Sequence, residues 1–289
     1  MRANYHTHCL YCDGAASAAD MARAARAAGY SALGFSSHAP LPFPTEWNMP
    51  SDRLGAYVAE IRGLAARYAN EDPPLDILLG LEIDWLEGTR TPGDAIFDQH
   101  GLDYRIGSVH FVRLPGAELC TVDCPAAEFA GLFERSGRDG RAIWREYYRD
   151  VAALIESGGF DILGHFDVVR KNNADGRYFD EDSPEYLAAA MEAASLLRGR
   201  DIVVEINVGA MNRGALDSPY PSLPILRELR RLDVPITFSA DAHAPEHFGR
   251  HLDAARVLAR EAGYAGIVVL DRPGPGGTRA WREVGIDET

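Results

Sequence analysis

Histidine and carboxylate side chains recur in this sequence at spacings that suit metal binding. His6 and His8 stand two residues apart in YHTHC, and Asp241 and His243 repeat that spacing in SADAH. Residues two apart on a strand point to the same side, so both members of a pair can reach one ion. Imidazole and carboxylate are ligands of borderline and hard divalent metals. The two pairs therefore predict a metal site.

Other histidines and acids stand at equivalent places. The chain has nine histidines, and six of them lie at or near the C-terminal ends of predicted strands. The metal-ligand candidates are His6, His8, Asp13, His38, Glu82, His110, His165, Asp241 and His243. One histidine at a strand end usually only forms hydrogen bonds, but six with interleaved carboxylates indicate metal binding. Glu205 suits hydrogen bonding to a ligand equally well. We interpret His100, His247 and His251 as surface residues.

The candidates outnumber the ligands of a single ion. One ion takes about four to six ligands, so this set implies two or three ions. Ions roughly 3.5–4 Å apart commonly catalyse hydrolytic displacement at phosphorus. The sequence therefore predicts a multinuclear hydrolase.

Alternating strand-like and helix-like segments must position these residues. Continuously apolar runs, typical of parallel strands buried on both faces, cover residues 3–9, 32–37, 76–83, 104–111, 161–166, 202–208, 235–240 and 266–270. Helical spacing of apolar residues covers 18–28, 54–68, 143–155, 186–197, 223–232 and 246–262. Seven or eight such units predict a closed α/β barrel whose strand ends meet on one face.

A doubly wound open sheet is the alternative fold, but no glycine-rich phosphate loop follows the first strand. We find no linker and expect residues 1–289 to form a single domain. The long loops 39–50, 113–125 and 171–183 are expected to cover the site.

Composition narrows the possible functions. The 289 residues are 46% hydrophobic and 25% charged, which indicates a folded protein, and the net charge of −14 disfavours a nucleic-acid partner. Neither a membrane span nor a signal peptide is evident, so we expect a cytoplasmic protein without a membrane partner. A four-thiolate zinc site from Cys9, Cys12, Cys120 and Cys124 is conceivable, but we expect four free thiols.

Seven motifs in order resemble the PHP (polymerase and histidinol phosphatase) family, and most closely its histidinol-phosphatase branch. They are YHTHCLYCDG, LGFSSHAPLPF with WNM beyond, LGLEIDW, LDYRIGSVHF with TVD beyond, DILGHFD, VVEIN and SADAH. The resemblance covers most of the chain. It implies a distorted TIM-like (β/α)7 barrel, with residues 266–270 as an appended terminal strand and a metal site at the C-terminal face of the strands.

The resemblance also implies how the ligands divide among three ions. The first ion would be held by His6, His8, Glu82 and Asp241. The second would share Glu82 and add His110 and His165. The third would take Asp13, His38 and His243. Members of the family contain zinc, iron or manganese, and histidine with carboxylate does not discriminate among them.

The activity implied is hydrolysis of the phosphomonoester L-histidinol phosphate, a step of histidine biosynthesis. Glu82, Asp241 and His165 would take part directly in catalysis, and the general acid could be a water, His165 or Asp241. Arg170 and Lys171 are the first candidates for binding phosphate, followed by Arg213. Phe43 and Trp47 could stack on an imidazole ring or simply close their loop.

The chain departs from the family pattern at two positions. Gly209 stands where relatives often carry a phosphate-binding arginine, and Cys9 stands where a threonine is usual. Another small phosphomonoester is therefore an alternative substrate. An amidohydrolase is a further alternative, although no lysine stands at a predicted strand end. The acidic balance disfavours a polymerase-associated, DNA-binding module. Spacing says nothing about oligomeric state.

Overall fold

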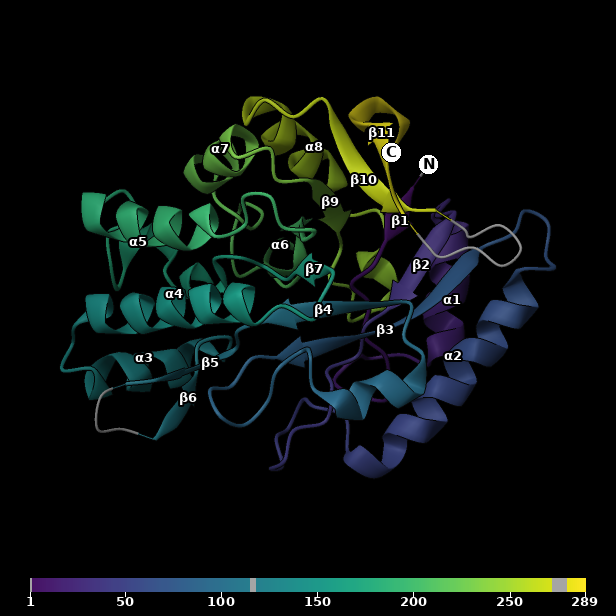
Figure 1. Cartoon of the computed structure of the whole chain (residues 1–289), viewed down its shortest axis with the longest axis horizontal. Helices are drawn as coiled ribbons and strands as arrows, with labels where there is room; N and C mark the ends of the chain where they lie inside the picture. The colour runs from purple at the N-terminus through teal and green to yellow at the C-terminus, as the bar shows by residue number, and fades with distance from the viewer. Residues whose placement is uncertain (1, 115–117, 272–279) are drawn as a thin grey trace.

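A sheet of short parallel strands forms the centre of the computed structural model (Figure 1). The structure describes residues 2–114, 118–271 and 280–289, and within them the sheet has seven strands in the order of the chain. They are β1 (Ala3–Asn4), β2 (Ala32–Phe35), β3 (Asp76–Asp84), β4 (Tyr104–Ser108), β7 (Ile162–Leu163), β8 (Val203–Asn207) and β9 (Ile236–Ser239). All neighbouring pairs in this sheet are parallel, as a barrel of βα units requires.

The sheet closes between its first and last strands just beyond their C-terminal ends. A parallel bridge joins Thr7 to Ala242. The His8 amide donates to the Ala242 carbonyl at 2.9 Å, and the Ala242 amide donates to the His6 carbonyl at 3.0 Å. The distorted TIM-like barrel predicted from the sequence is thus confirmed.

Helices surround the barrel. They are α1 (Ala18–Ala27), α2 (Leu54–Tyr68), α3 (Ala126–Arg135), α4 (Gly140–Ser157), α5 (Pro184–Ser195), α6 (Gly209–Asn212), α7 (Leu223–Arg231) and α8 (Leu252–Glu261). Short 3₁₀ turns are η1 (Ser51–Arg53), η2 (Ala95–His100), η3 (Val168–Arg170), η4 (Ala174–Gly176), η5 (Pro245–His247) and η6 (Ile286–Glu288). Figure 1 shows α1 and α2 on one side of the sheet and α4 and α5 on the other. No described helix is long and apolar enough to cross a membrane.

Two antiparallel hairpins lie outside the barrel sheet. Strand β10 (Gly266–Leu270) has the predicted bounds, but it pairs with β11 (Trp281–Gly285), which the sequence analysis did not predict. Strand β5 (Phe111–Arg113) pairs with β6 (Leu119–Thr121). The prediction that 113–125 is only a loop was therefore wrong, because part of it pairs back onto the end of the preceding apolar run.

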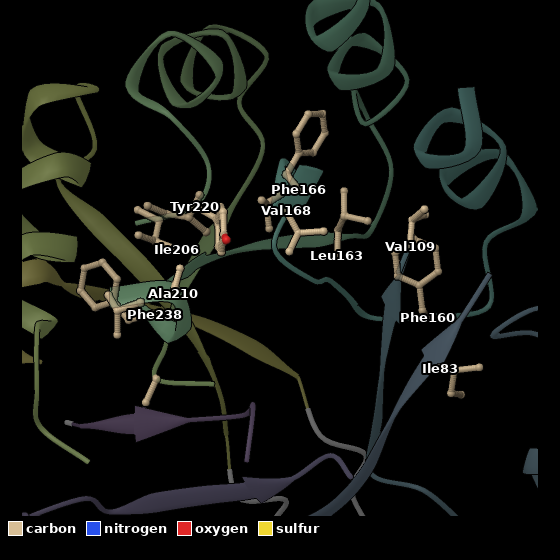
Figure 2. Close-up of a cluster of buried hydrophobic side chains, with 14 of the residues drawn as sticks. Ile83, Val109, Phe160, Leu163, Phe166, Val168, Ile206, Ala210, Tyr220 and Phe238 are labelled. Atoms are coloured by element: carbon tan, nitrogen blue, oxygen red, sulfur yellow. The ribbon is translucent and has the colours of Figure 1, made fainter. Parts of the chain in front are cut away.

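Apolar packing between strands and helices makes the main core. Figure 2 shows part of it, with Ile83 from β3, Ile206 from β8 and Phe238 from β9, together with Val109 and Phe166 from the segments after β4 and β7. All five side chains are at most 3% exposed. The strands are thus held from outside by the helices, which leaves their C-terminal ends free to carry polar residues.

A smaller apolar cluster fills the barrel interior below the polar residues. Its members are Tyr5, Ala32, Leu78, Tyr104, Ile106, Ile162 and Leu270. The Tyr104 hydroxyl donates to the Tyr5 carbonyl at 2.5 Å and lies 3.1 Å from the Phe35 carbonyl. Gly34 and Gly80 make room for this side chain, since a Cβ atom at Gly34 would lie 2.3 Å from the Tyr104 hydroxyl and one at Gly80 would lie 2.5 Å from the ring. The Tyr104 ring therefore fills the barrel interior below the polar residues.

Candidate metal centre

The segments that follow the barrel strands bring all nine predicted ligands together. Seven of them line a cavity of about 310 Å³: Asp13, His38, Glu82, His110, His165, Asp241 and His243. His6 and His8 follow β1 and are fully buried, at 0% exposure, against the same carboxylates. Because parallel strands end at one face of a barrel, residues far apart in the sequence meet there.

Glu82, near the end of β3, lies at the centre of the cluster. Its Oε2 atom is 3.1 Å from His6 Nε2 and 3.4 Å from His8 Nε2. Its Oε1 atom is 3.0 Å from His165 Nε2 and 3.3 Å from His110 Nε2. The two oxygens of one carboxylate thus face two different pairs of imidazoles, which is the geometry of a bridging ligand.

Asp241 follows β9 and faces the first of these pairs. Its Oδ1 atom is 3.7 Å from His6 Nε2 and 3.4 Å from His8 Nε2. The backbone of Asp241 has a φ of 45°, in the left-handed region that non-glycine residues rarely adopt. Such strain persists where the surrounding structure imposes it, and it clusters at functional sites.

Asp13 organises a third group on the exposed side of the cluster. Its carboxylate is 3.2 Å from His243 Nε2 and 3.8 Å from His38 Nε2. The other ring nitrogen of His38 is 3.0 Å from Glu82 Oε2. His38 therefore lies between the third group and the central carboxylate.

Several buried atoms in the cluster lack a hydrogen bond within the described part of the chain. These atoms are His6 Nε2, His8 Nε2, His38 Nδ1 and Glu82 Oε2. Buried polar atoms without partners are costly, and these four face one another. Divalent metal ions would satisfy them, because imidazole nitrogen and carboxylate oxygen are the donors that such ions take. The donor set therefore fits metal binding.

Two carboxylates contact ligand imidazoles at Nδ1, the ring nitrogen that faces away from Glu82. Both oxygens of Glu205 lie 3.0 Å from His6 Nδ1, and Oε1 also accepts the His165 amide at 2.8 Å. Asp84 Oδ1 lies 2.7 Å from His110 Nδ1. These contacts fix which nitrogen of each ring faces the cluster. Asp84 was not among the predicted site residues, although its position two residues after Glu82, on the same strand face, could have identified it.

Opposite charges keep the central acids ionised. Burial acts to raise the pKa of Glu82, but His6, His38 and His110 outweigh it and hold this pKa well below its ordinary value. Burial acts the same way on Asp241, where Arg213 and His6 hold the pKa well below its usual range. Both carboxylates are therefore anionic at neutral pH, as metal ligands must be.

Two of the three predicted phosphate-binding residues line the cavity. The guanidinium of Arg213 lies 3.2 Å from Asp241 Oδ2 and 3.2 Å from His243 Nδ1. Lys171 pairs with Asp123, which also lines the cavity. Asp123 did not appear among the predicted site residues, although it lies in the quoted TVD motif. Cationic groups thus flank the predicted ligands.

The structure does not bring Arg170 to the cavity, so its prediction as a phosphate-binding residue needs correction. It is 8% exposed and donates to Glu181 Oε2 at 3.0 Å, to the Pro219 carbonyl at 3.0 Å and to Ser218 Oγ at 2.7 Å. Arg170 is the last residue of η3 and lines a different cavity, together with Glu181, whereas Lys171 lines the cavity of the predicted ligands. Its hydrogen bonds connect η3 to the segments that carry Glu181 and Ser218.

The backbone explains why glycine occupies position 209. A Cβ atom on Gly209 would lie 2.3 Å from Asp241 Oδ2, so no side chain fits there without displacing that carboxylate. Arg213, directly after the short helix α6, reaches Asp241 instead. The cation beside Asp241 is therefore Arg213, four residues after Gly209.

Two other predictions concern residues beside the cluster. His247 is not a surface residue: it is 9% exposed, and its Nδ1 accepts the His243 amide at 3.2 Å. The segment after β9 folds back here, which the sequence pattern does not reveal. The four cysteines are free, as predicted. Cys12 Sγ lies 3.4 Å from His8 Nδ1.

Comparison with known proteins identifies similar sequences. The family model of the PHP domain matches residues 4–209. A Deinococcus radiodurans protein named as a probable histidinol-phosphatase is 31% identical over 242 residues, covering 83% of this chain and 85% of that protein. The histidinol-phosphatase of Bacillus subtilis is 26% identical, covering 78% of this chain and 87% of that protein.

Solved structures share the fold. A candidate histidinol phosphatase from Listeria monocytogenes matches with a TM-score of 0.77 and 20% identity, covering 87% of this chain and 99% of that one. Histidinol phosphate phosphatase from Lactococcus lactis, crystallised with zinc, L-histidinol and phosphate, matches with a TM-score of 0.64 and 20% identity. That alignment covers 93% of this chain and 96% of the other.

Proposed function

The chain belongs to the PHP domain family, and we propose that it is a phosphoric monoester hydrolase acting on L-histidinol phosphate. The observation that carries this proposal is the gathering of eight histidine and acidic side chains around Glu82 at one end of the barrel. The names of the Deinococcus and Bacillus relatives support the substrate, and so does the Lactococcus structure with L-histidinol and phosphate.

We assign the ligands to two or three divalent ions. His6, His8, Glu82 and Asp241 would hold the first, Glu82, His110 and His165 the second, and Asp13, His38 and His243 the third. Zinc, iron and manganese all suit these donors, and zinc is present in the Lactococcus relative. Bound ions would supply a water of lowered pKa as nucleophile and stabilise negative charge on phosphoryl oxygens.

The protein's own side chains would orient the ester and balance its charge. Lys171 and Arg213 would donate hydrogen bonds to phosphoryl oxygens, with more effect as negative charge develops. Asp241 stays ionised and His165 is assigned to a metal ion, so the proton for the departing alcohol would come from a water. Glu205 would orient the His6 ring, and Asp84 would orient the His110 ring, each through its contact with Nδ1.

A substrate comparison tests the assignment. The metal-loaded enzyme should hydrolyse L-histidinol phosphate with a kcat/KM about a hundredfold or more above that for p-nitrophenyl phosphate, because only the natural leaving group would gain binding energy. Equal rates would contradict the biosynthetic role and favour another small phosphomonoester.

Substitution of the central acids tests the site. Glu82→Gln and Asp241→Asn should nearly abolish turnover while the circular dichroism spectrum stays unchanged. Anomalous scattering at metal edges, with phosphate bound, should place at least two ions in contact with His6, His8, Glu82 and Asp241. Wild-type rates in both variants would contradict the mechanism.

A further inference from the structure

A second cavity opens beside the metal centre and shares a wall with it. Its volume is about 650 Å³, roughly twice the 310 Å³ of the first cavity. Glu46 and Trp47 line both cavities. An ester whose phosphate lies among the predicted ligands can therefore extend its alcohol portion past these two residues. The second cavity is thus placed to receive a leaving group.

Aromatic rings form much of the second cavity. Trp47 stacks on Phe111, with ring centroids 5.4 Å apart and planes at 28°. Phe43 meets Phe111 edge-on at 6.1 Å. Trp85 and Leu86 extend the apolar wall. Because the faces of aromatic rings carry negative electrostatic potential, this wall suits a planar or compact cation.

Charged residues around the cavity favour the same kind of ligand. The carboxylates are those of Glu46, Glu87, Glu118 and Asp150, and the guanidiniums are those of Arg113 and Arg149. Arg149 is already paired, at 2.9 Å from Asp150 Oδ1 and in contact with Glu146. The surplus of negative charge would attract a cation and repel an anionic alcohol portion.

The loop that carries Glu46 and Trp47 is tied to the metal centre. Asn48 Nδ2 donates to the Ala39 carbonyl at 2.8 Å and lies 3.4 Å from Asp84 Oδ2. The backbone N–H of Asn48 donates to Thr45 Oγ1 at 2.9 Å. Since Asp84 also contacts the His110 ring, the loop and the predicted ligands share a hydrogen-bonded support. These contacts hold the loop that carries Glu46 beside the predicted ligands, with the Glu46 side chain exposed where the two cavities meet.

We propose that the second cavity is a leaving-group subsite that selects phosphomonoesters of cationic alcohols, with Glu46 as a specificity-determining residue and Trp47 as the surface on which the cation lies. The inference rests on the proposed phosphatase activity and names its substrate class. The class is wider than L-histidinol phosphate: an ester of a quaternary ammonium alcohol also meets the requirement.

An isosteric pair of esters isolates the contribution of charge. Phosphocholine and 3,3-dimethylbutyl phosphate have nearly the same shape, and only the first carries a cation. Each is measured as a competitor of p-nitrophenyl phosphate hydrolysis by the metal-loaded enzyme. Wild-type protein should bind phosphocholine about fivefold or more tightly, from cation–π and ionic contacts together. Glu46→Gln should lower the ratio of inhibition constants at least twofold and leave the part due to Trp47, and Glu46→Lys should lower it further.

Glu261→Gln, an exposed change at the end of α8, is the matched control and should keep the wild-type ratio. A wild-type ratio near one, or a ratio that Glu46→Gln does not alter, would overturn the proposal. Poor turnover of L-histidinol phosphate with the charge preference intact would refute only the proposed substrate. Absence of any p-nitrophenyl phosphate hydrolysis would count against both proposals.

Discussion

Glu82 is the residue on which the geometry of the candidate centre depends most. Its two oxygens face different pairs of imidazoles, and Oε1 also accepts the Ser108 hydroxyl at 2.7 Å. One carboxylate thus connects two groups of ligands that come from different strands. Substituting a residue that orients one of these imidazoles is therefore as informative as substituting a ligand.

Asp84→Asn should weaken metal binding without removing a ligand. The carboxylate holds His110 Nδ1 at 2.7 Å, and an amide there would lose the charge that orients the ring. We expect metal affinity to fall about 10- to 100-fold, measured by competition with a chromogenic chelator. Asp52→Asn, an exposed change in η1, is the control. Unchanged affinity in Asp84→Asn would show that Asp84 has no part in orienting His110.

The neighbouring cations Arg170 and Lys171 should behave differently when neutralised. Lys171→Met and Arg213→Met should each raise the inhibition constant of inorganic phosphate about tenfold or more, since a hydrogen bond to a charged group contributes about 1.5–3 kcal/mol. Arg170→Met should instead lower the melting temperature, because it leaves Glu181 and the buried Asp167 without their cation. If Arg170→Met raised the inhibition constant of phosphate more than Lys171→Met did, the placement of Lys171, and not Arg170, at the phosphate site would be wrong.

At the scale of elements, helix α4 carries a titratable group whose effect on stability has a definite sign. Burial raises the pKa of Asp150 to about 6, although Arg149 acts to lower it. A carboxyl that is more easily protonated in the folded state favours folding at low pH. That contribution is complete below the ordinary pKa of an aspartate and is lost as pH rises through about 6.

Asp150→Asn tests this sign. The free energy of unfolding of wild-type protein minus that of the variant should fall by about 2 kcal/mol between pH 4 and pH 7. Urea titration of metal-free protein at constant ionic strength measures it. Glu156→Gln, an exposed change on the same helix, should show no such step. A difference that grows with pH would mean that the Arg149 contact dominates over burial.

The barrel could be predicted from sequence because its signals are local. Helix α2 has the predicted bounds, since helical spacing of apolar residues marks a helix directly. Strands β1 and β7 are shorter than the apolar runs that contain them, because the residues after Asn4 and Leu163 leave the ladder to carry His6, His8 and His165. Helix α3 and strand β6 were not predicted from the sequence.

The candidate site was predictable only in part. Strand periodicity and strand ends brought out the nine ligand candidates, because alternation and parallel order determine which side chains meet. The directions of Arg170 and Arg213, and the burial of His247, depend on loop packing that no spacing encodes. The wall made by Glu46 and Trp47 likewise depends on the contact of Asn48 with Asp84, the last residue of β3, 36 residues further along the chain.

For the whole molecule, the single-domain prediction can be tested by unfolding. Helices pack around one barrel, so scanning calorimetry of the metal-loaded protein should show one cooperative transition. Dialysis against a chelator should abolish activity and lower the melting temperature, since ligands that bind only the folded state stabilise it, by about 4 kcal/mol at a thousandfold excess over Kd. Adding back zinc or manganese should restore both. Two separate transitions would contradict a single domain.

The packing around Tyr104 has a kinetic consequence. The barrel interior below the candidate centre is closed by packed side chains around Tyr104, whose hydroxyl donates to the Tyr5 carbonyl, so no molecule can pass through the barrel at that end. Substrate would therefore enter, and both products would leave, on the side of the C-terminal ends of the strands. An orthophosphate held among the predicted ligands would lie further in than the alcohol, so its release should come last and should determine how soon the next substrate binds.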